Sequence, residues 1–469
     1  MEIQFCGAAR EITGSAHLIR LNNGFQILLD CGLYQGHSDS MKSFNEEWYF
    51  DPAEIDCVIL SHAHIDHSGR LPRLIKDGFS GIIHGTHATR SLCTIMLLDS
   101  AHIQQRDAEY HNYRMKKKGR TDELREPLYT KLDVHHCMEQ FVGYGYDRWF
   151  KISDQVEVLF RDAGHILGSA SVTLRIREDG QTRLLGFTGD IGRPRRPILR
   201  DPRSMPEVDY LICESTYGDR LHDEAPAETK KFLRIIRETC VENRGKLIIP
   251  AFSVGRTQEL VYLLDQLETD GQLPRIPVYV DSPLAVNATM IYGSHPECFD
   301  NELNEYMLID DNPFGFNRLS YVRDVEKSKE LNESEDPCII ISSAGMINAG
   351  RVKHHVYHAI DNPKNTIFLV GYCAPGTPGG YLREGVEELR LFGDWMPVRA
   401  KVEIMDSFSA HADRMELLEF LRNQVGSAKE IFLVHGTLDR QESFRGLLMD
   451  NGFSSVRIPK LKEKVSLYT

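Results

Sequence analysis

Short apolar runs recur along this chain, and each of them ends in a cluster of small or polar residues. Continuous runs of this kind are typical of strands that are buried on both faces and that deliver polar groups to one edge of a sheet. They predict strands at 55–60, 184–187, 210–213, 247–249, 278–280, 339–341, 367–370 and 431–434. Between them, apolar residues recur at helical spacing, as at Leu417, Leu418 and Leu421. Alternating strands and helices predict a layered α/β protein.

Two stretches interrupt this alternation. A connection rich in Pro and Arg covers 194–206, and a second break lies at Asp394-Trp395-Met396-Pro397. The segment between them has its own strand and helix pattern, so we interpret it as an inserted domain. The stretch Val172 to Ile176 alternates apolar and polar residues, which predicts a strand with one solvated face and therefore mixed sheets.

The composition is that of a globular protein. The chain has 469 residues, of which 41% are hydrophobic and 26% charged, and its length favours two or three domains. Its 10 Cys are irregularly spaced, which favours a reduced, cytoplasmic environment over a disulfide framework. We expect no membrane contact and no signal peptide, because no apolar run is long enough to span a bilayer and the start MEIQFCGAAR lacks a basic leader.

The strongest chemical motif is Ser61-His62-Ala63-His64-Ile65-Asp66-His67-Ser68-Gly69, directly after a predicted strand. Two His at positions i and i+2 of an extended turn point to the same side and can hold one metal ion. Asp66 and His67 follow one turn later and face a neighbouring position. A single loop could therefore supply ligands to two metals. The alternative is a polar, solvated loop with surface histidines.

Further ligand candidates stand at the ends of later strands. His165 lies between Gly164 and Gly168, where the backbone can approach a metal closely. Asp190 follows a predicted buried strand, and a carboxylate there can bridge two cations. His435 repeats this arrangement near the C-terminus. Each of these residues alone is equally compatible with a structural role, but together with the first motif they indicate a metal site.

Together these residues resemble the successive motifs of the metallo-β-lactamase fold: Asp30 in Leu28-Leu29-Asp30-Cys31-Gly32, then His62, His64, Asp66 and His67, then His165 and Asp190. Three more motifs resemble those of the β-CASP branch of that fold: Glu214 in Cys213-Glu214-Ser215-Thr216-Tyr217-Gly218, His411 in Phe408-Ser409-Ala410-His411-Ala412-Asp413, and His435. The resemblance implies an αββα sandwich built from 1–208 and 396–469, with an α/β β-CASP domain, 209–395, inserted between them.

Carried over residue by residue, the resemblance implies two zinc ions, with manganese or iron as alternatives. His62, His64 and His165 would hold one ion, Asp66, His67 and His435 the other, and Asp190 would bridge them. Asp30 would lie behind the ligands and orient one of the histidines. The alternative for Asp30 is a carboxylate in a turn at the end of a strand.

Two such cations lower the pKa of a shared water and take up charge on a phosphate oxygen, which suits phosphodiester hydrolysis. The leaving oxygen needs a proton, and His411 is our candidate general acid, with Glu214 holding its tautomer. His411 also precedes a predicted helix, 414–421, so a role in helix capping is the alternative.

Two further loops resemble substrate loops of the family. Ser343, Ala344 and Gly345 follow a predicted strand, and small residues there let N–H groups and hydroxyls reach a phosphate. Ser253 and Arg256, in Pro250-Ala251-Phe252-Ser253-Val254-Gly255-Arg256, would face the substrate. Ordinary turn chemistry is the alternative for either loop.

The formal net charge of −13 argues against binding of polyanions by bulk electrostatics, so contact with nucleic acid needs a local basic patch or a metal. Two basic clusters are present: Arg114, Lys116, Lys117, Lys118 and Arg120, and Arg193, Arg195, Arg196, Arg200 and Arg203. A solvated surface is the usual explanation for such runs. The second cluster follows Asp190 and is the better candidate for substrate contact, through Arg193 and Arg196.

The resulting hypothesis is a zinc-dependent ribonuclease acting on single-stranded RNA, as an endonuclease, a 5′ exonuclease or both. His435 favours RNA, because the DNA-acting members of the branch carry an aliphatic residue there. A DNA-acting nuclease, a hydrolase of small thioesters or lactams, and a catalytically silent RNA-processing scaffold are the alternatives. The sequence does not identify any partner protein, and it leaves open whether the chain forms a homodimer.

Overall fold

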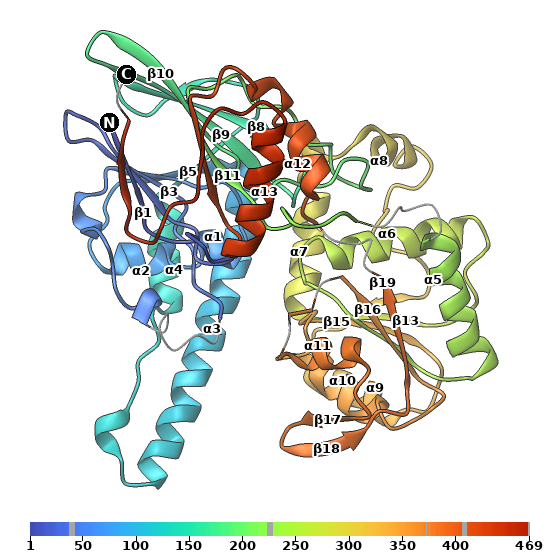
Figure 1. Cartoon of the computed structure of the whole chain (residues 1–469). Helices are drawn as coiled ribbons and strands as arrows, with labels where there is room; N and C mark the ends of the chain where they lie inside the picture. Colours follow the sequence, from blue (N-terminus) through green and yellow to red (C-terminus); the bar gives the residue numbers. More distant parts are fainter. Residues whose placement is uncertain (37–42, 223–227, 372, 375, 406–409, 468–469) are drawn as a thin grey trace. The chain divides into compact units, whose positions relative to one another are not determined.

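The computed structural model describes residues 1–36, 43–222, 228–371, 373–374, 376–405 and 410–467 (Figure 1). Its contacts divide the chain into two compact units, one formed by Met1–Leu221 and His411–Thr469 and the other by His222–Ala410. In the part of the chain that the structure describes, no helix is both long and apolar enough to cross a membrane.

The first unit contains two sheets, each of seven described strands. The first sheet has, in spatial order, β22 (Lys464–Ser466), β1 (Glu2–Phe5), β2 (His17–Arg20), β3 (Gln26–Leu29), β4 (Cys57–Ile59), β5 (Ile82–Thr86) and β6 (Phe141–Tyr144). The second has β21 (Val456–Arg457), β20 (Glu430–Val434), β11 (Tyr210–Glu214), β10 (Gln181–Phe187), β9 (Ala170–Glu178), β8 (Val156–Asp162) and β7 (Phe150–Lys151). Both sheets mix parallel and antiparallel pairs, as predicted.

The inner faces of the two sheets form one core. Ile19, Leu29 and Ile59 of the first sheet pack with Phe160 and Phe432 of the second, and all five are buried. This interdigitation of apolar side chains from facing sheets holds a sandwich together. Thr173, one of the polar residues that alternate with apolar ones along β9, is buried as well. The prediction that this face of the strand is solvated is therefore wrong at this residue.

Helices cover the two outer faces of the sandwich (Figure 1). Leu417 of α12 (Arg414–Phe420) and Phe444 of α13 (Leu438–Asp450) share a second core with Leu211 and Leu433 of the second sheet. The helix α3 packs on β5 and β6 of the first sheet and contacts α1 and α4. The helices on this side are α1 (Ile65–Ser68), α2 (Leu71–Lys76), α3 (His87–Lys117) and α4 (Lys131–Glu139). The predicted αββα sandwich is confirmed.

The second unit contains a wholly parallel sheet of six described strands. Their spatial order is β14 (Leu319–Tyr321), β13 (Val278–Asp281), β15 (Ile339–Ser342), β12 (Leu247–Pro250), β16 (Thr366–Val370) and β19 (Lys401–Met405). The helices are α5 (Glu228–Ile236), α6 (Arg256–Thr269), α7 (Pro283–Gly293), α8 (Asn301–Tyr306), α9 (Val325–Glu333), α10 (Arg351–Ala359) and α11 (Pro378–Glu384). Such a parallel sheet needs a helix after most strands, which explains the alternating pattern in the sequence.

The stretch Asp394–Pro397, where the sequence predicts the end of the insert, is a strand, β18, paired with β17 (Glu388–Leu391). Trp395 is 63% exposed, so the hairpin lacks the apolar run that marks a buried strand. The predicted insert, 209–395, differs at both ends from the compact second unit. Strand β11 pairs with β10 and β20 in the first unit, whereas β19 pairs with β16 in the second. Since contacts and evolutionary domains need not coincide, the ends at 209 and 395 stay predictions.

One buried carboxylate links the stability of the second unit to pH. Asp265 of α6 is 1% exposed and accepts a hydrogen bond from Tyr306 Oη at 2.7 Å. Burial, together with the negative charges of Asp310 and Glu268, outweighs that bond and raises the pKa of Asp265 to about 6. Between pH 4 and 6 the folded chain therefore binds a proton that the unfolded chain has released, and the free energy of unfolding falls as the pH rises.

We expect Asp265→Asn to raise the free energy of unfolding at pH 8, measured by urea unfolding, by about 1–3 kcal/mol over wild type, because it removes the buried charge and keeps an acceptor for Tyr306. The gain should shrink toward pH 4. The matched control is Asp270→Asn, at an exposed position at the end of the same helix. An equal gain at both pH values would contradict the assignment.

Candidate metal centre

The candidate ligands all lie in the first unit, at the ends of strands. His62 and His64 follow β4, and Asp66 and His67 lie on the short helix α1. His165 lies in the loop between β8 and β9, and Asp190 follows β10. His435 directly follows β20. Residues that are far apart in the sequence therefore meet where the two sheets present their strand ends.

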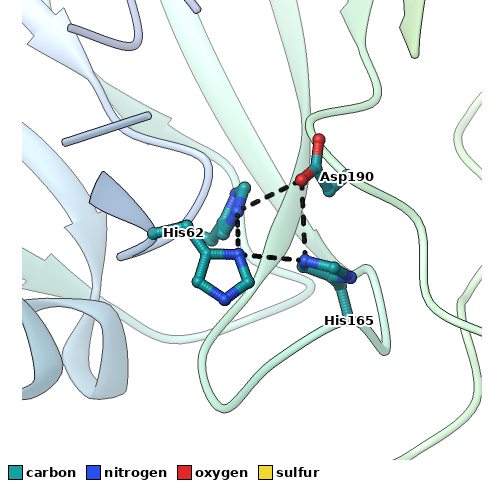
Figure 2. A group of neighbouring side chains, drawn as sticks. His62, His165 and Asp190 are labelled. Carbon is teal, nitrogen blue, oxygen red and sulfur yellow. Dashed lines mark hydrogen bonds and ion pairs between the residues drawn. The ribbon is translucent and has the colours of Figure 1, made fainter. Parts of the chain in front are cut away.

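A first group brings three histidines together with Asp190 (Figure 2). His64 Nδ1 lies 3.1 Å from both His62 Nε2 and His165 Nε2. Asp190 Oδ2 lies 3.5 Å from His62 Nε2 and 3.5 Å from His165 Nε2. Ligands at about 2.05 Å around a tetrahedral zinc ion are about 3.3 Å apart, so these separations fit the edges of such a site.

A second group contains Asp66, His67 and His435. The Nε2 atoms of His67 and His435 are 3.0 Å apart, and Asp66 Oδ2 is 3.4 Å from His435 Nε2. Asp190 also reaches this group, since its Oδ2 lies 3.3 Å from His67 Nε2 and its Oδ1 lies 3.7 Å from His435 Nε2. Asp190 therefore stands between the two groups.

Hydrogen bonds on the far side of the rings determine which nitrogens face inward. His67 Nδ1 donates to Asp30 Oδ2 at 2.7 Å, and His435 Nδ1 donates to Thr216 Oγ1 at 2.9 Å. His62 Nδ1 lies 3.0 Å from Ser61 Oγ, which itself donates to Asp30 Oδ2. These bonds place the ring proton on Nδ1, so that each Nε2 atom has a lone pair that faces the other rings. Facing lone pairs repel unless a proton or a metal ion lies between them.

The electrostatics of the site also favour a cation. Burial lowers the pKa of His64 to about 4, which keeps this ring in the neutral form that binds metals. Burial also lowers the pKa of His67, but Asp190 and Asp30 raise it well above its ordinary value, so this position favours a positive charge. Asp190 Oδ1 is buried and has no hydrogen-bond partner among the described residues. The donor set, the spacing and this oxygen fit bound metal.

Tight turns place the ligands. Gly168 has φ +81°, and a Cβ there would lie 2.5 Å from the backbone nitrogen of Thr89. Its carbonyl accepts hydrogen bonds from the hydroxyls of Thr86 and Thr89 at 2.7 and 2.8 Å, which attaches the His165 loop to the start of α3. Asp30 and His435 also adopt left-handed conformations, with φ 58° and 54°. Such strained residues concentrate at functional sites.

His411 and Glu214 form a third group with Asp190. His411 Nδ1 lies 3.4 Å from Glu214 Oε2 and 3.9 Å from Asp190 Oδ2, and its ring contacts that of His165. Burial lowers the pKa of His411, but Glu214 more than offsets this and raises it to about 9. Glu214 is itself held by the backbone N–H of Ile191.

His411 is positioned by the chain on both sides. Ala412 N donates to Ile191 O at 2.8 Å, and Gly192 and His411 form an isolated antiparallel bridge. Asp413 caps α12 through a capping box with Glu416, as the alternative interpretation of this segment expected. Arg193 Nε pairs with Glu416 at 3.3 Å, so it joins the Asp190 loop to α12. Phe408 and Ser409 lie outside the described residues.

The remaining predicted substrate residues lie elsewhere. Ser253 and Ser343, in the second unit, have their Oγ atoms 2.6 Å apart. The hydroxyl of Ser282 lies within 3.3 Å of both and was missed from the sequence, because a Ser at the start of a helix is an ordinary cap. Ala344 and Gly345 directly follow Ser343 in the same loop. Arg256, also in the second unit, pairs with Glu259. Arg196 lies in the first unit and is partly buried.

Other histidines that could be ligands by spacing have different contacts. His355 lies 2.7 Å from Asp281, which also pairs with Arg351. His84 lies 3.1 Å from the hydroxyl of Tyr144. Among the described residues, neither His355 nor His84 belongs to a group of His, Cys, Asp or Glu that could share a metal. The groups found are the three described above.

The sandwich, its inserted parallel-sheet unit and this His and Asp cluster define a metallo-hydrolase. Three family models match the chain: the metallo-beta-lactamase superfamily over 9–238, the Beta-Casp domain over 257–382, and a Zn-dependent metallo-hydrolase RNA specificity domain over 395–459. The last includes both His411 and His435.

Similar proteins cover nearly the whole chain. A protein named ribonuclease TTHA0252, from Thermus thermophilus, is 34% identical over 96% of this chain and 97% of its own length. An RNase J-like protein from Methanocaldococcus jannaschii is 31% identical over 94% of both chains. A transcription termination factor FttA from the same organism is 30% identical over 99% of this chain and 72% of its own. The chain therefore belongs to the metallo-β-lactamase/β-CASP family of RNA-specific nucleases, and the predicted family and enzyme class are confirmed.

Removal of metal should destabilise the first unit, because repelling lone pairs and buried carboxylates would be left without a cation. We expect a chelator to lower the unfolding midpoint by at least about 5 °C and added zinc to restore it. Differential scanning calorimetry measures both. A double variant, His62→Ala with Asp190→Asn, should respond less than wild type, because it loses one ligand of the first group and the carboxylate that stands between the groups. An unchanged midpoint in wild type that still contains metal before treatment would contradict this expectation.

Proposed function

We propose that this chain is a zinc-dependent ribonuclease that hydrolyses phosphodiester bonds of single-stranded RNA. The observation that carries the proposal is that the buried carboxylate of Asp190 stands between two groups of candidate ligands, which are His62, His64 and His165, and Asp66, His67 and His435. The match of the RNA specificity domain to the segment that contains His411 and His435, and the similarity to a ribonuclease over nearly the whole chain, support RNA as the substrate.

In this proposal two zinc ions bind. His62, His64 and His165 would hold one ion, Asp66, His67 and His435 would hold the other, and the carboxylate of Asp190 would serve both. Asp30 orients His67 and, through Ser61, His62. When bound, the metal pair supplies a nucleophilic hydroxide at neutral pH and positive charge opposite the phosphate.

His411 is the proposed general acid. Its ring lies beside His165 and is 20% exposed, so it borders the metal centre and can also reach a substrate oxygen. Glu214 stabilises the protonated ring at 3.4 Å and holds its orientation. The proton of the imidazolium passes to the oxygen that leaves as the P–O bond breaks.

The remaining contacts bind the RNA backbone in this proposal. The hydroxyls of Ser253 and Ser343, with the small residues Ala344 and Gly345, can donate to phosphate oxygens. Arg193, Arg196 and Arg256 supply positive charge. Because Arg193 is also paired with Glu416, its loss should disturb the loop after Asp190 as well as substrate binding.

Labelled RNA tests the proposal directly. We expect purified protein to cleave single-stranded RNA carrying a 5′ or a 3′ label, and a chelator to abolish the cleavage. Internal ladders would identify an endonuclease, and released mononucleotide a 5′ exonuclease. Cleavage of matched DNA with equal efficiency would favour the DNA-acting alternative. No chelator-sensitive cleavage of any RNA, in protein shown to contain zinc, would leave the scaffold alternative.

His411→Ala should lower kcat by about 10²- to 10⁴-fold, the usual contribution of a general acid, while zinc content stays at the wild-type level. Metal analysis and single-turnover cleavage measure the two effects separately. The matched control is His136→Ala, an exposed histidine of α4 outside the metal groups, which should cleave at the wild-type rate. A wild-type rate in His411→Ala with zinc retained would refute the role of this residue.

A further inference from the structure

The helix α3 is far longer than its packing requires. Its first half packs on the sandwich through buried residues such as Leu92, Met96 and Ala101. Beyond Ala101, Met115 is the one buried residue that the structure describes on this helix. Figure 1 shows the second half of α3 extending away from the sheets, followed by a returning segment. We call residues 102–128 the arm.

One face of the arm is covered by its own returning segment. His111 Nε2 bonds the carbonyl of Glu123 at 2.9 Å. Asn112 exchanges two hydrogen bonds with the backbone of Arg125, at 2.9 and 2.8 Å, and Gln104 accepts from Leu128 N at 3.2 Å. These contacts keep the arm folded and orient the helix. They use only one side of it.

The opposite face carries large side chains that are exposed. Ile103, Tyr110 and Tyr113 are 51%, 64% and 65% exposed. Their spacing of seven and three residues places them on one face of a helix, and Arg106, Arg114 and Lys117 fall on the same face. We call these six residues the arm stripe. A helix face with exposed aromatic residues at regular spacing indicates a binding surface.

The charge of the arm stripe restricts its partner. Arg114 lies over the ring of Tyr110 at 5.9 Å, and Lys116, Lys117, Lys118 and Arg120 are exposed at the tip. Among these five residues of the described arm, Arg120 forms an ion pair, with Glu123. Asp107 and Glu109 flank the stripe without removing its positive balance. The tip is thus positive on a chain whose net charge is −13.

We propose that the arm stripe is a second RNA-binding surface, on which bases stack against Tyr110 and Tyr113 while Arg106, Arg114 and Lys117 contact phosphates. Aromatic rings alternating with cations are the usual surface for single-stranded nucleic acid. The proposal rests on the proposed function, because it assigns the surface to the strand on which the metal centre acts. From the sequence alone this basic run resembles a solvated surface; the aromatic residues on the same helix face change that interpretation.

The helix also determines how long an RNA must be to use the stripe. The start of α3 is attached to the His165 loop through Thr86 and Thr89. At 1.5 Å per residue, Ile103 lies about 24 Å and Lys117 about 45 Å along the helix from His87. The stripe therefore contacts a part of the RNA well away from the cleaved bond. Short RNA cannot occupy both places.

The test compares two oligouridylates that carry a fluorescent label, one of about 30 nucleotides and one of about 6. These lengths are chosen because a single binding site for a single strand covers about 4–16 nucleotides. Fluorescence anisotropy gives Kd, and cleavage gives KM and kcat. We expect Tyr110→Ala with Tyr113→Ala to raise Kd and KM for the long RNA by about tenfold or more, since each stacked base contributes strongly. The kcat, and the Kd for the short RNA, should remain at wild-type values.

A second variant keeps the test independent of any effect of the tyrosines on folding. Arg106→Gln, Arg114→Gln and Lys117→Gln together should weaken binding of the long RNA and lower the slope of log Kd against log salt by about 2, at about 0.7 per cation. The matched control removes the same charge elsewhere in the first unit, by Lys151→Gln, Lys429→Gln and Lys464→Gln, at positions 58%, 54% and 54% exposed. It should leave Kd for the long RNA nearly unchanged.

Wild-type affinity for the long RNA in both arm variants would overturn the proposal and favour a protein partner for the stripe. Equal loss for long and short RNA, or equal loss in the control, would also overturn it, since the effect would not be local to the arm. Failure of the proposed function looks different. Wild-type protein would then not cleave RNA at all, while the binding comparison would still report on the stripe.

Discussion

The buried carboxylate of Asp190 is the group on which the rest of this structure depends. It is 2% exposed, and its Oδ2 lies within 3.5 Å of ring nitrogens from His62, His67 and His165. Burying charge and lone pairs at such distances is costly unless a cation compensates them. The strand ends, the glycine turns and the hydrogen bonds behind the rings all hold this arrangement in place. The site fits bound metal, and binding there would couple to folding of the first unit.

The parallel pairing of β11 with β20 in the first unit brings Glu214 close to the segment that contains His435. Glu214 pairs with Val434, so the residue that contacts His411 lies beside the start of the His435 turn. The Asp190 loop is then joined to the His411 segment through Ile191, Gly192 and Arg193. Site residues more than 200 positions apart are thus brought together by a few backbone pairs, those of β11 with β20 and of Gly192 with His411. The inserted unit must fold without disturbing these pairs.

The sequence predicted the strands before most of the site residues, and it predicted the αββα sandwich through its resemblance to a family. These predictions succeeded because buried strands and metal motifs are local patterns of residue type. The strand at 394–397 was not predicted, because an exposed hairpin has no apolar run. Ser282 was missed because its contacts are hydroxyls from two distant loops, those of Ser253 and Ser343. The basic run at 114–120 could not be interpreted without the helix face beside it.

By itself, the sequence determined which ligand types are present, their spacing in the first loop, and the alternation of strands and helices. Each of these depends on neighbours within about ten residues. The tertiary structure decided which nitrogens face inward and which face of α3 is exposed. These features depend on contacts between distant segments, such as Asp30 with His67 and Asn112 with Arg125, and no local pattern carries that information.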